Sequence, residues 1–181
     1  MGHHNPPPAT VLIGLRGSGK TTLGRLLAAR RGVPFIDLDD RTVAGSGHAS
    51  VSAFFRSAGE PAFRAAESLA LQAVLAAPER AVIALGGGTP TAPGAQEAIR
   101  AARAAGRVRV VLLEAPPAVL GARLAAAPGD RPLLMGTDFA QEAALLGERR
   151  LPLYRSIADA VVTTAGDAEA SLAAIEAVTP S

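Results

Sequence analysis

The sequence contains no cysteine and no tryptophan, and it has only one tyrosine and one lysine. Without cysteine the chain can form no disulfide, thiolate metal site or cysteine nucleophile, which fits a reducing compartment. Aromatic residues make up only 3% of the chain, so the core must consist of aliphatic side chains and alanine. Scattered arginines with few aromatics also argue against a surface that stacks on nucleic-acid bases.

Long apolar runs are absent as well. None approaches the roughly 18 residues of a membrane span, and the N-terminus lacks the apolar stretch of a signal peptide. We expect residues 1–9 to form a flexible tail, with His3 and His4 as part of it rather than of a metal site. These features predict a cytoplasmic protein that binds neither membrane nor nucleic acid.

Short apolar runs alternate along the chain with longer segments rich in Ala, Leu, Glu and Arg. The expected strands are 11–13, 33–38, 80–85, 108–113 and 160–163, and the expected helices are 20–31, 60–77, 93–105, 116–126, 139–150 and 168–178. This alternation predicts an α/β fold, with a five-stranded parallel sheet covered by helices on both faces. We expect a single domain over residues 10–181, with a lid at 125–138 where prolines and glycines interrupt the periodicity.

The single lysine, Lys20, belongs to a phosphate-binding motif. Residues 14–21 read Gly-Leu-Arg-Gly-Ser-Gly-Lys-Thr, between an expected strand and an expected helix. In such a loop the backbone N–H groups bind phosphate oxygens, the lysine reaches the β- and γ-phosphates, and the hydroxyl of Thr21 binds Mg²⁺. A forked guanidinium has a different shape and cannot replace the compact ammonium group. The motif predicts a nucleoside triphosphate site, to which we also assign Gly17, Ser18, Gly19 and Thr22.

Asp37 and Asp39 come at the end of the second expected strand. Residues i and i+2 of a strand face the same way, and ligands of α/β proteins bind at the carboxyl ends of the strands. One carboxylate can hold the metal and the other can orient a substrate hydroxyl, and phosphoryl transfer needs both groups. The alternative is that Asp39 or Asp40 caps the next helix. The phosphate loop upstream favours the functional interpretation.

Four further features are candidates for binding. Arg64 and Glu67 share one face of an expected helix, as a surface ion pair or as part of a site. Residues 86–88 are three glycines after the third strand, which let a ligand approach the backbone. Arg131 lies in the expected lid, where it can close over the phosphates. Arg150 ends an expected helix, where a positive charge is favourable even without a ligand.

In chain order the motifs are G-x-x-G-x-G-K-T, D-x-D, G-E-x-x-F-R-x-x-E, G-G-G, R-P-L-L and R-x-P-L-Y. This combination resembles shikimate kinase over residues 10–178. The resemblance implies a three-layer P-loop kinase fold and ATP-dependent phosphorylation of the 3-hydroxyl of shikimate, a step towards chorismate and aromatic amino acids. It also implies ATP and Mg²⁺ as cofactors, shikimate as the small-molecule partner, and a monomer.

The resemblance also implies roles for individual residues. On the nucleotide side they are Lys20 and Thr21 for ATP and Mg²⁺, Asp37 for the metal, Arg131 at the phosphates, and Arg123 as the closest candidate for an arginine against adenine, one position out of register. On the substrate side they are Asp39 for the hydroxyls and as base, Arg64 and Arg150 for the carboxylate, Glu67 in support, and the backbone of Gly86, Gly87 and Gly88. Residues 43–48 are richer in glycine than the family pattern.

Three alternatives can be weighed against this interpretation. A guanine-nucleotide switch would be expected to carry N-K-x-D, which is impossible here because Asn5 and Lys20 are the only Asn and Lys. A sibling gluconate or nucleotide kinase is disfavoured by the D-x-D, F-R-x-x-E and G-G-G motifs. An inactive, ligand-binding homologue is supported only by the altered segment 43–48.

Overall fold

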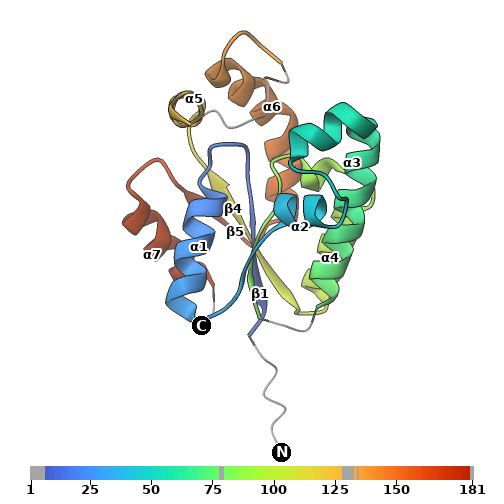
Figure 1. The fold of residues 1–181 in the computed structure, drawn as a ribbon. Coiled ribbons are helices and arrows are strands. Elements are labelled where there is room, and N and C mark those ends of the chain that lie inside the picture. The colour runs from blue at the N-terminus through green and yellow to red at the C-terminus, as the bar shows by residue number, and fades with distance from the viewer. Residues whose placement is uncertain (1–6, 78–79, 128–132, 134, 180–181) are drawn as a thin grey trace, which may run out of the picture.

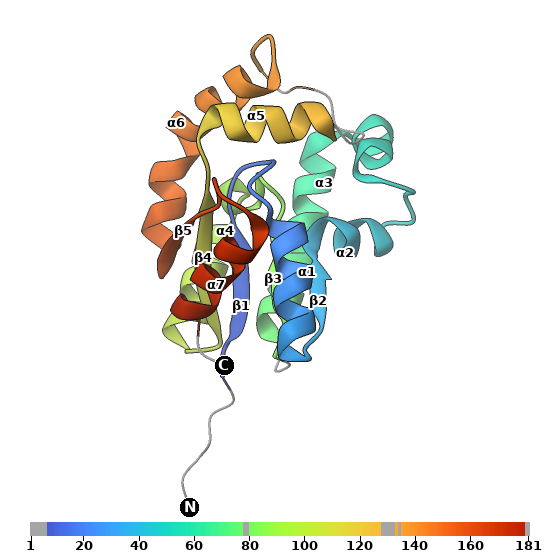
Figure 2. The same ribbon diagram turned by 90° about the vertical axis from the view of Figure 1, so that its left-hand side faces the viewer.

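The computed structural model describes residues 7–77, 80–127, 133 and 135–179. Five parallel strands form one sheet in the order β2-β3-β1-β4-β5. The strands are β1 (Ala9–Ile13), β2 (Phe35–Asp37), β3 (Val82–Ala84), β4 (Val108–Glu114) and β5 (Ala160–Thr163). The helices are α1 (Lys20–Arg31), α2 (Leu38–Ala44), α3 (Val51–Ala76), η1 (Thr89–Thr91), α4 (Ala95–Ala104), α5 (Pro117–Ala126), α6 (Phe139–Ile157) and α7 (Ala168–Val178). The predicted parallel α/β sheet is therefore confirmed (Figures 1 and 2).

Two apolar layers cover the sheet, and β1 shows why. Val11 and Ile13 pack with residues of α3, α4 and α6, whereas Leu12 between them packs with residues of α1 and α7. Successive side chains of a strand point to opposite faces, so a strand covered on both sides is mainly apolar, as β1 is from Val11 to Ile13. Figure 1 shows α1 and α7 on one side of the strands and α3 and α4 on the other.

A third apolar cluster lies outside the sheet and contains three of the five phenylalanines. Phe54, Phe55 and Phe63 of α3 pack there, and the rings of Phe54 and Phe63 meet edge to face with centroids 5.5 Å apart. His48 stacks on Phe54 at 4.3 Å. The few aromatic residues are thus concentrated beside the glycine-rich segment 43–48, and the main core is largely aliphatic.

Several predicted boundaries were wrong. Ala9 already belongs to β1, not to a tail. The second strand stops at Asp37 because the Asp37 side chain accepts a hydrogen bond from the Asp39 N–H and so starts α2, a helix that the sequence did not predict. Asp39 therefore lies in the first turn of a helix, and the i, i+2 strand argument does not apply to it.

Two helices are longer than predicted. Helix α3 begins at Val51, and Gly59 interrupts it with φ 81° and ψ 165°, so the predicted start at residue 60 matches only its second part. Helix α6 continues through Pro152 to Ile157, although we expected it to end at Arg150. The extra turns of α6 place Tyr154 and Ile157 in the core, and this burial offsets the backbone hydrogen bond that proline cannot make.

Candidate active site

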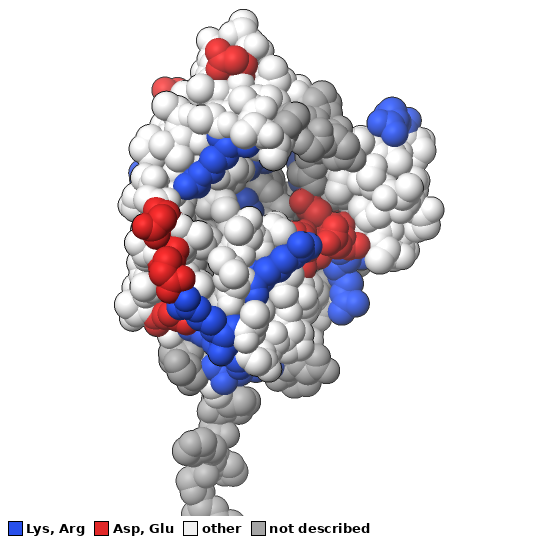
Figure 3. Space-filling view, turned by 60° about the vertical axis from the view of Figure 1, so that its left-hand side comes forward, with Lys and Arg blue, Asp and Glu red and all other residues white. Residues whose placement is uncertain are grey.

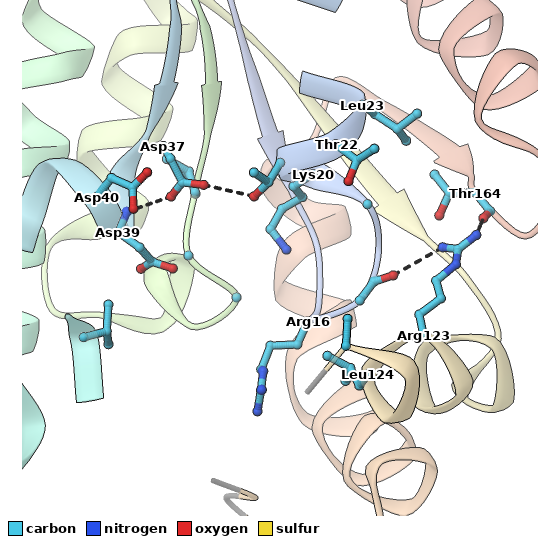
Figure 4. A pocket seen from close by; sticks show the side chains of 18 of the residues that line it. Arg16, Lys20, Thr22, Leu23, Asp37, Asp39, Asp40, Arg123, Leu124 and Thr164 are labelled. Atoms are coloured by element: carbon cyan, nitrogen blue, oxygen red, sulfur yellow. Dashed lines mark hydrogen bonds between the residues drawn. The ribbon is translucent and has the colours of Figure 1, made fainter. Parts of the chain in front are cut away.

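A cleft of about 910 Å³ opens at the carboxyl ends of the strands. The phosphate loop, the start of α2, the loop after β3, α5 and the start of α7 contribute its walls (Figure 4). Figure 3 shows the hollow, with acidic side chains gathered on one rim and a basic side chain on the opposite rim. Parallel strands bring all these loops to one edge, which is where α/β proteins bind ligands.

The phosphate loop follows β1 and leads into α1. Gly17 and Gly19 have φ of 77° and 90°, a left-handed backbone that L side chains rarely adopt. Lys20 is 9% exposed, and its Nζ donates to the carbonyls of Gly14 at 2.9 Å and Leu15 at 2.8 Å. The ammonium group is thus held inside the loop, at the N-terminus of a helix where anions bind.

Thr21 and Asp37, the two residues predicted to bind the metal, lie side by side. The Thr21 hydroxyl donates to Asp37 Oδ2 at 2.9 Å, and both residues line the cleft. A hydroxyl and a carboxylate beside a phosphate loop fit Mg²⁺, which takes few protein ligands and completes its shell with water and phosphate oxygens. Within the described residues there is no cluster of three or more Asp, Glu, His or Cys that could hold a metal.

Asp39 lies across the cleft from Lys20, against the first glycine after β3. A Cβ atom on Gly86 would lie 2.6 Å from Asp39 Oδ1 and 2.9 Å from both Glu67 Oε1 and Thr89 Oγ1. Glu67 is fully buried and accepts a hydrogen bond from the Thr89 hydroxyl at 2.6 Å. Gly86 is therefore glycine because the carboxylates of α2 and α3 meet the β3 loop here.

This crowding makes Gly86→Ala a test of the site. The added methyl must displace the Asp39 carboxylate or the Glu67–Thr89 pair, and an error of about 1 Å in a catalytic group lowers the rate about a hundredfold. We expect that fall in kcat, measured by ADP release. Gly147→Ala is the matched control, since a Cβ there makes only ordinary contacts at 3.5 and 3.7 Å. Equal activity of the two variants would contradict the crowding argument.

Arg64 and Arg150 line a second cavity of about 610 Å³ rather than the main cleft. Arg64 pairs with Glu67 at 2.8 Å and Glu60 at 3.0 Å. Burial alone would lower the pKa of Arg64, but the two carboxylates outweigh it and raise the pKa. A Cβ on Gly88 would lie 2.8 Å from Arg64 Nη2, so the second cavity adjoins the glycine loop.

Gly87 joins the two cavities. Its carbonyl accepts hydrogen bonds from Arg150 Nη1 at 3.1 Å and from the hydroxyl of Tyr154 at 2.7 Å. Burial raises the pKa of Tyr154 to about 12, against the opposing effect of the neighbouring Arg150 and Arg64 cations. The phenol therefore stays protonated, as a donor, throughout the neutral range. The sequence motif included Tyr154 but did not reveal this role.

Arg123 lines the main cleft, and its guanidinium binds backbone carbonyls. It donates to the carbonyl of Gly17 at 3.2 Å and to that of Thr164. The Thr164 hydroxyl in turn donates to the carbonyl of Ser18 at 3.0 Å. The loop before α7, which carries no recognised motif, is thus tied to the phosphate loop. Arg131 and the rest of the segment 128–132, with residue 134, lie outside the described residues, so this part of the expected lid is not described.

Comparison with known proteins identifies this arrangement. A family model described as shikimate kinase matches residues 16–179. The chain belongs to the shikimate kinase family. The predicted activity, ATP-dependent phosphorylation of shikimate with Mg²⁺, is the activity of this family, and the predicted family, fold and enzyme class are confirmed.

Individual relatives agree with this membership. The chain is 38% identical to the shikimate kinase of Saccharopolyspora erythraea, covering 88% of this chain and 86% of that one. It is 41% identical to the shikimate kinase of Mycobacterium avium, with 87% and 84% covered. The structure of Acinetobacter baumannii shikimate kinase in complex with shikimate superposes with a TM-score of 0.84 at 30% identity, covering 96% and 94%.

A gluconokinase from Sinorhizobium meliloti superposes less closely, with a TM-score of 0.60 at 19% identity and coverage of 95% of this chain and 91% of that one. This likeness concerns the fold alone. Among the described residues no helix is both long and apolar enough to cross a membrane.

Proposed function

We propose that this chain transfers the γ-phosphoryl group of ATP to the 3-hydroxyl of shikimate, with Asp39 as the hydroxyl-orienting base. The observation that carries the proposal is the convergence at Gly86, where Asp39 and the buried Glu67–Thr89 pair meet opposite Lys20. A hydroxylated ring seated on this loop would have a carboxylate on one side and the phosphate loop on the other.

The residues then divide the reaction between them. ATP is the phosphoryl donor, and Thr21 and Asp37 would hold Mg²⁺, which would neutralise charge on the phosphates. Asp39 accepts the hydroxyl proton as the O–P bond forms, and the bond from the γ-phosphorus to the bridging oxygen breaks in line. Lys20 stabilises the charge that develops on the phosphates. Arg131, as the family resemblance implies, adds a second cation there.

Arg64 and Arg150 are proposed to bind the shikimate carboxylate at the second cavity. Two guanidinium groups line that cavity beside the glycine loop, and arginine suits planar, bidentate recognition of carboxylates. Glu67, buried and paired to Arg64, orients that guanidinium. The remaining expectations, a monomer in the cytoplasm with one domain over residues 10–181, a substrate region at 39–77 and a lid at 125–138, stay predictions.

An ADP-release assay tests the acceptor. Shikimate, quinate, gluconate and AMP are compared at equal concentration with Mg·ATP, and we expect strong stimulation by shikimate alone. Nucleotide binding without turnover in the presence of shikimate would support the inactive-homologue alternative. Stimulation by gluconate or AMP would instead indicate a sibling kinase.

Arg64→Lys tests the carboxylate site without leaving the buried Glu67 unpaired. Lysine keeps the charge but loses the fork, and losing a charged hydrogen bond weakens binding by about tenfold to a hundredfold. We expect the KM for shikimate to rise by that factor, with the KM for ATP unchanged. Arg100→Lys, at an exposed position of α4, is the control. An unchanged KM for shikimate would mean that Arg64 is only a structural ion pair.

A further inference from the structure

Arg16 is the one charged residue of the phosphate loop to which the proposed reaction assigns no role. It stands between Leu15 and Gly17 and lines the main cleft, with a side chain that is 17% exposed. In Figure 4, Arg16 and Lys20 extend from the phosphate loop towards the space that Asp39 faces from the other side. Arg16 therefore borders the space between the nucleotide loop and the acceptor residues.

Among the described residues, Glu142, Phe139 and Gly87 lie against Arg16. Its Nη1 lies 3.7 Å from Oε2 of Glu142, a carboxylate in the first turn of α6 that is only 2% exposed. Its guanidinium lies 5.9 Å from the centre of the Phe139 ring. A Cβ atom on Gly87 would lie 3.3 Å from the backbone nitrogen of Arg16 and 3.4 Å from the Cγ atom of Arg16. The side chain thus begins against the glycine loop and ends at α6.

The ion pair between Arg16 and Glu142 is a contact of opposite charges rather than a close, bidentate pair. A separation of 3.7 Å exceeds hydrogen-bond range, whereas a bidentate arginine–carboxylate pair brings nitrogen and oxygen to about 2.8 Å. Phosphate oxygens accept the same planar donors at the shorter distance. A phosphoryl group in the cleft can therefore compete with Glu142 for the Arg16 guanidinium.

We propose that Arg16 is a further phosphate-binding residue, which contacts the γ-phosphoryl group of the bound triphosphate. The inference rests on the proposed function for the identity of the nucleotide. Glu142 and Phe139 keep the guanidinium at the cleft when the γ-phosphoryl group is absent. When that group is present, the Arg16 guanidinium leaves the Glu142 carboxylate and binds the γ-phosphoryl oxygens. It then stabilises the charge that spreads over these oxygens during transfer.

The two nucleotides ADP and a non-hydrolysable ATP analogue separate this role from a structural one. Affinities of both, with Mg²⁺ and no acceptor, are measured by calorimetry for the wild type, Arg16→Gln and Arg16→Lys. We expect Arg16→Gln to lower the affinity for the analogue by about tenfold to a hundredfold and the affinity for ADP by less than about twofold. The affinity of Arg16→Lys for the analogue should lie between those of the wild type and Arg16→Gln. Arg25→Gln, an exposed arginine of α1, should change neither affinity.

Glu142→Gln distinguishes competition from simple pairing. If the pair only holds α6 in place, removing either partner should have the same effect on the analogue. If Glu142 competes with phosphate, Glu142→Gln should raise the affinity for the analogue above that of the wild type, opposite in direction to Arg16→Gln. Melting temperatures of both variants show that they are folded.

The proposal would be overturned if Arg16→Gln lowered the affinities for ADP and for the analogue equally, or lowered neither. An Arg16→Gln variant whose only defect is a higher KM for shikimate would also overturn it, since Arg16 would then contact the acceptor. The calorimetric affinities need no acceptor, so a chain that failed to phosphorylate shikimate would overturn the proposed function and leave the γ-phosphoryl contact to be judged separately.

Discussion

Lys20→Arg should lower kcat by about a hundredfold to a thousandfold, the effect of removing one donor aimed at transition-state charge. Arginine keeps the positive charge of lysine but needs more room than the loop provides. Lys20 is almost fully buried, and its Nζ lies within 2.9 Å of two loop carbonyls. A guanidinium is planar and broader than an ammonium group, so it cannot occupy this position while the loop keeps its shape. The measurement is single-turnover phosphorylation of shikimate at saturating Mg·ATP.

The matched control for Lys20→Arg is Arg25→Lys. It makes the reverse exchange at an exposed position one and a half turns further along α1. We expect its kcat to equal that of the wild type. If Lys20→Arg also kept wild-type activity, shape would not explain why the only lysine of the chain stands at this position.

Asp39→Asn should lower kcat by about a hundredfold to ten-thousandfold, the usual contribution of a general base. The amide keeps the size of the side chain and its contact with the Gly86 loop but accepts no proton. We expect the melting temperature to change little, because the side chain that caps α2 is that of Asp37 and not that of Asp39. Steady-state kinetics and thermal unfolding of the same preparation give both quantities.

Glu97→Gln is the control for Asp39→Asn, because it neutralises an exposed carboxylate on α4, away from the cleft. A fall in melting temperature of Asp39→Asn that matched its loss of activity would make Asp39 a structural residue. A kcat within threefold of the wild type would remove it as the base.

The local motifs allowed much of the fold and site to be predicted. The phosphate loop could be placed from the sequence, because its glycines, Lys20 and Thr21 lie within eight consecutive residues and need no distant partner to be recognised. The five strands could be found because the strands of a covered parallel sheet are short, mainly apolar runs. The α2 helix could not, since its start depends on whether the Asp37 side chain turns back to the Asp39 N–H.

The sequence by itself therefore determined that a triphosphate site precedes a pair of aspartates and a glycine loop on a parallel sheet. Only the tertiary structure decided that Arg150 and Tyr154 meet at the carbonyl of Gly87, and that the Arg16 guanidinium reaches Glu142 of α6. These partners are 63 to 126 residues apart in sequence. Spacing along a chain shows which side chains share a helix or strand face, but packing of α6 against the sheet sets which of them touch.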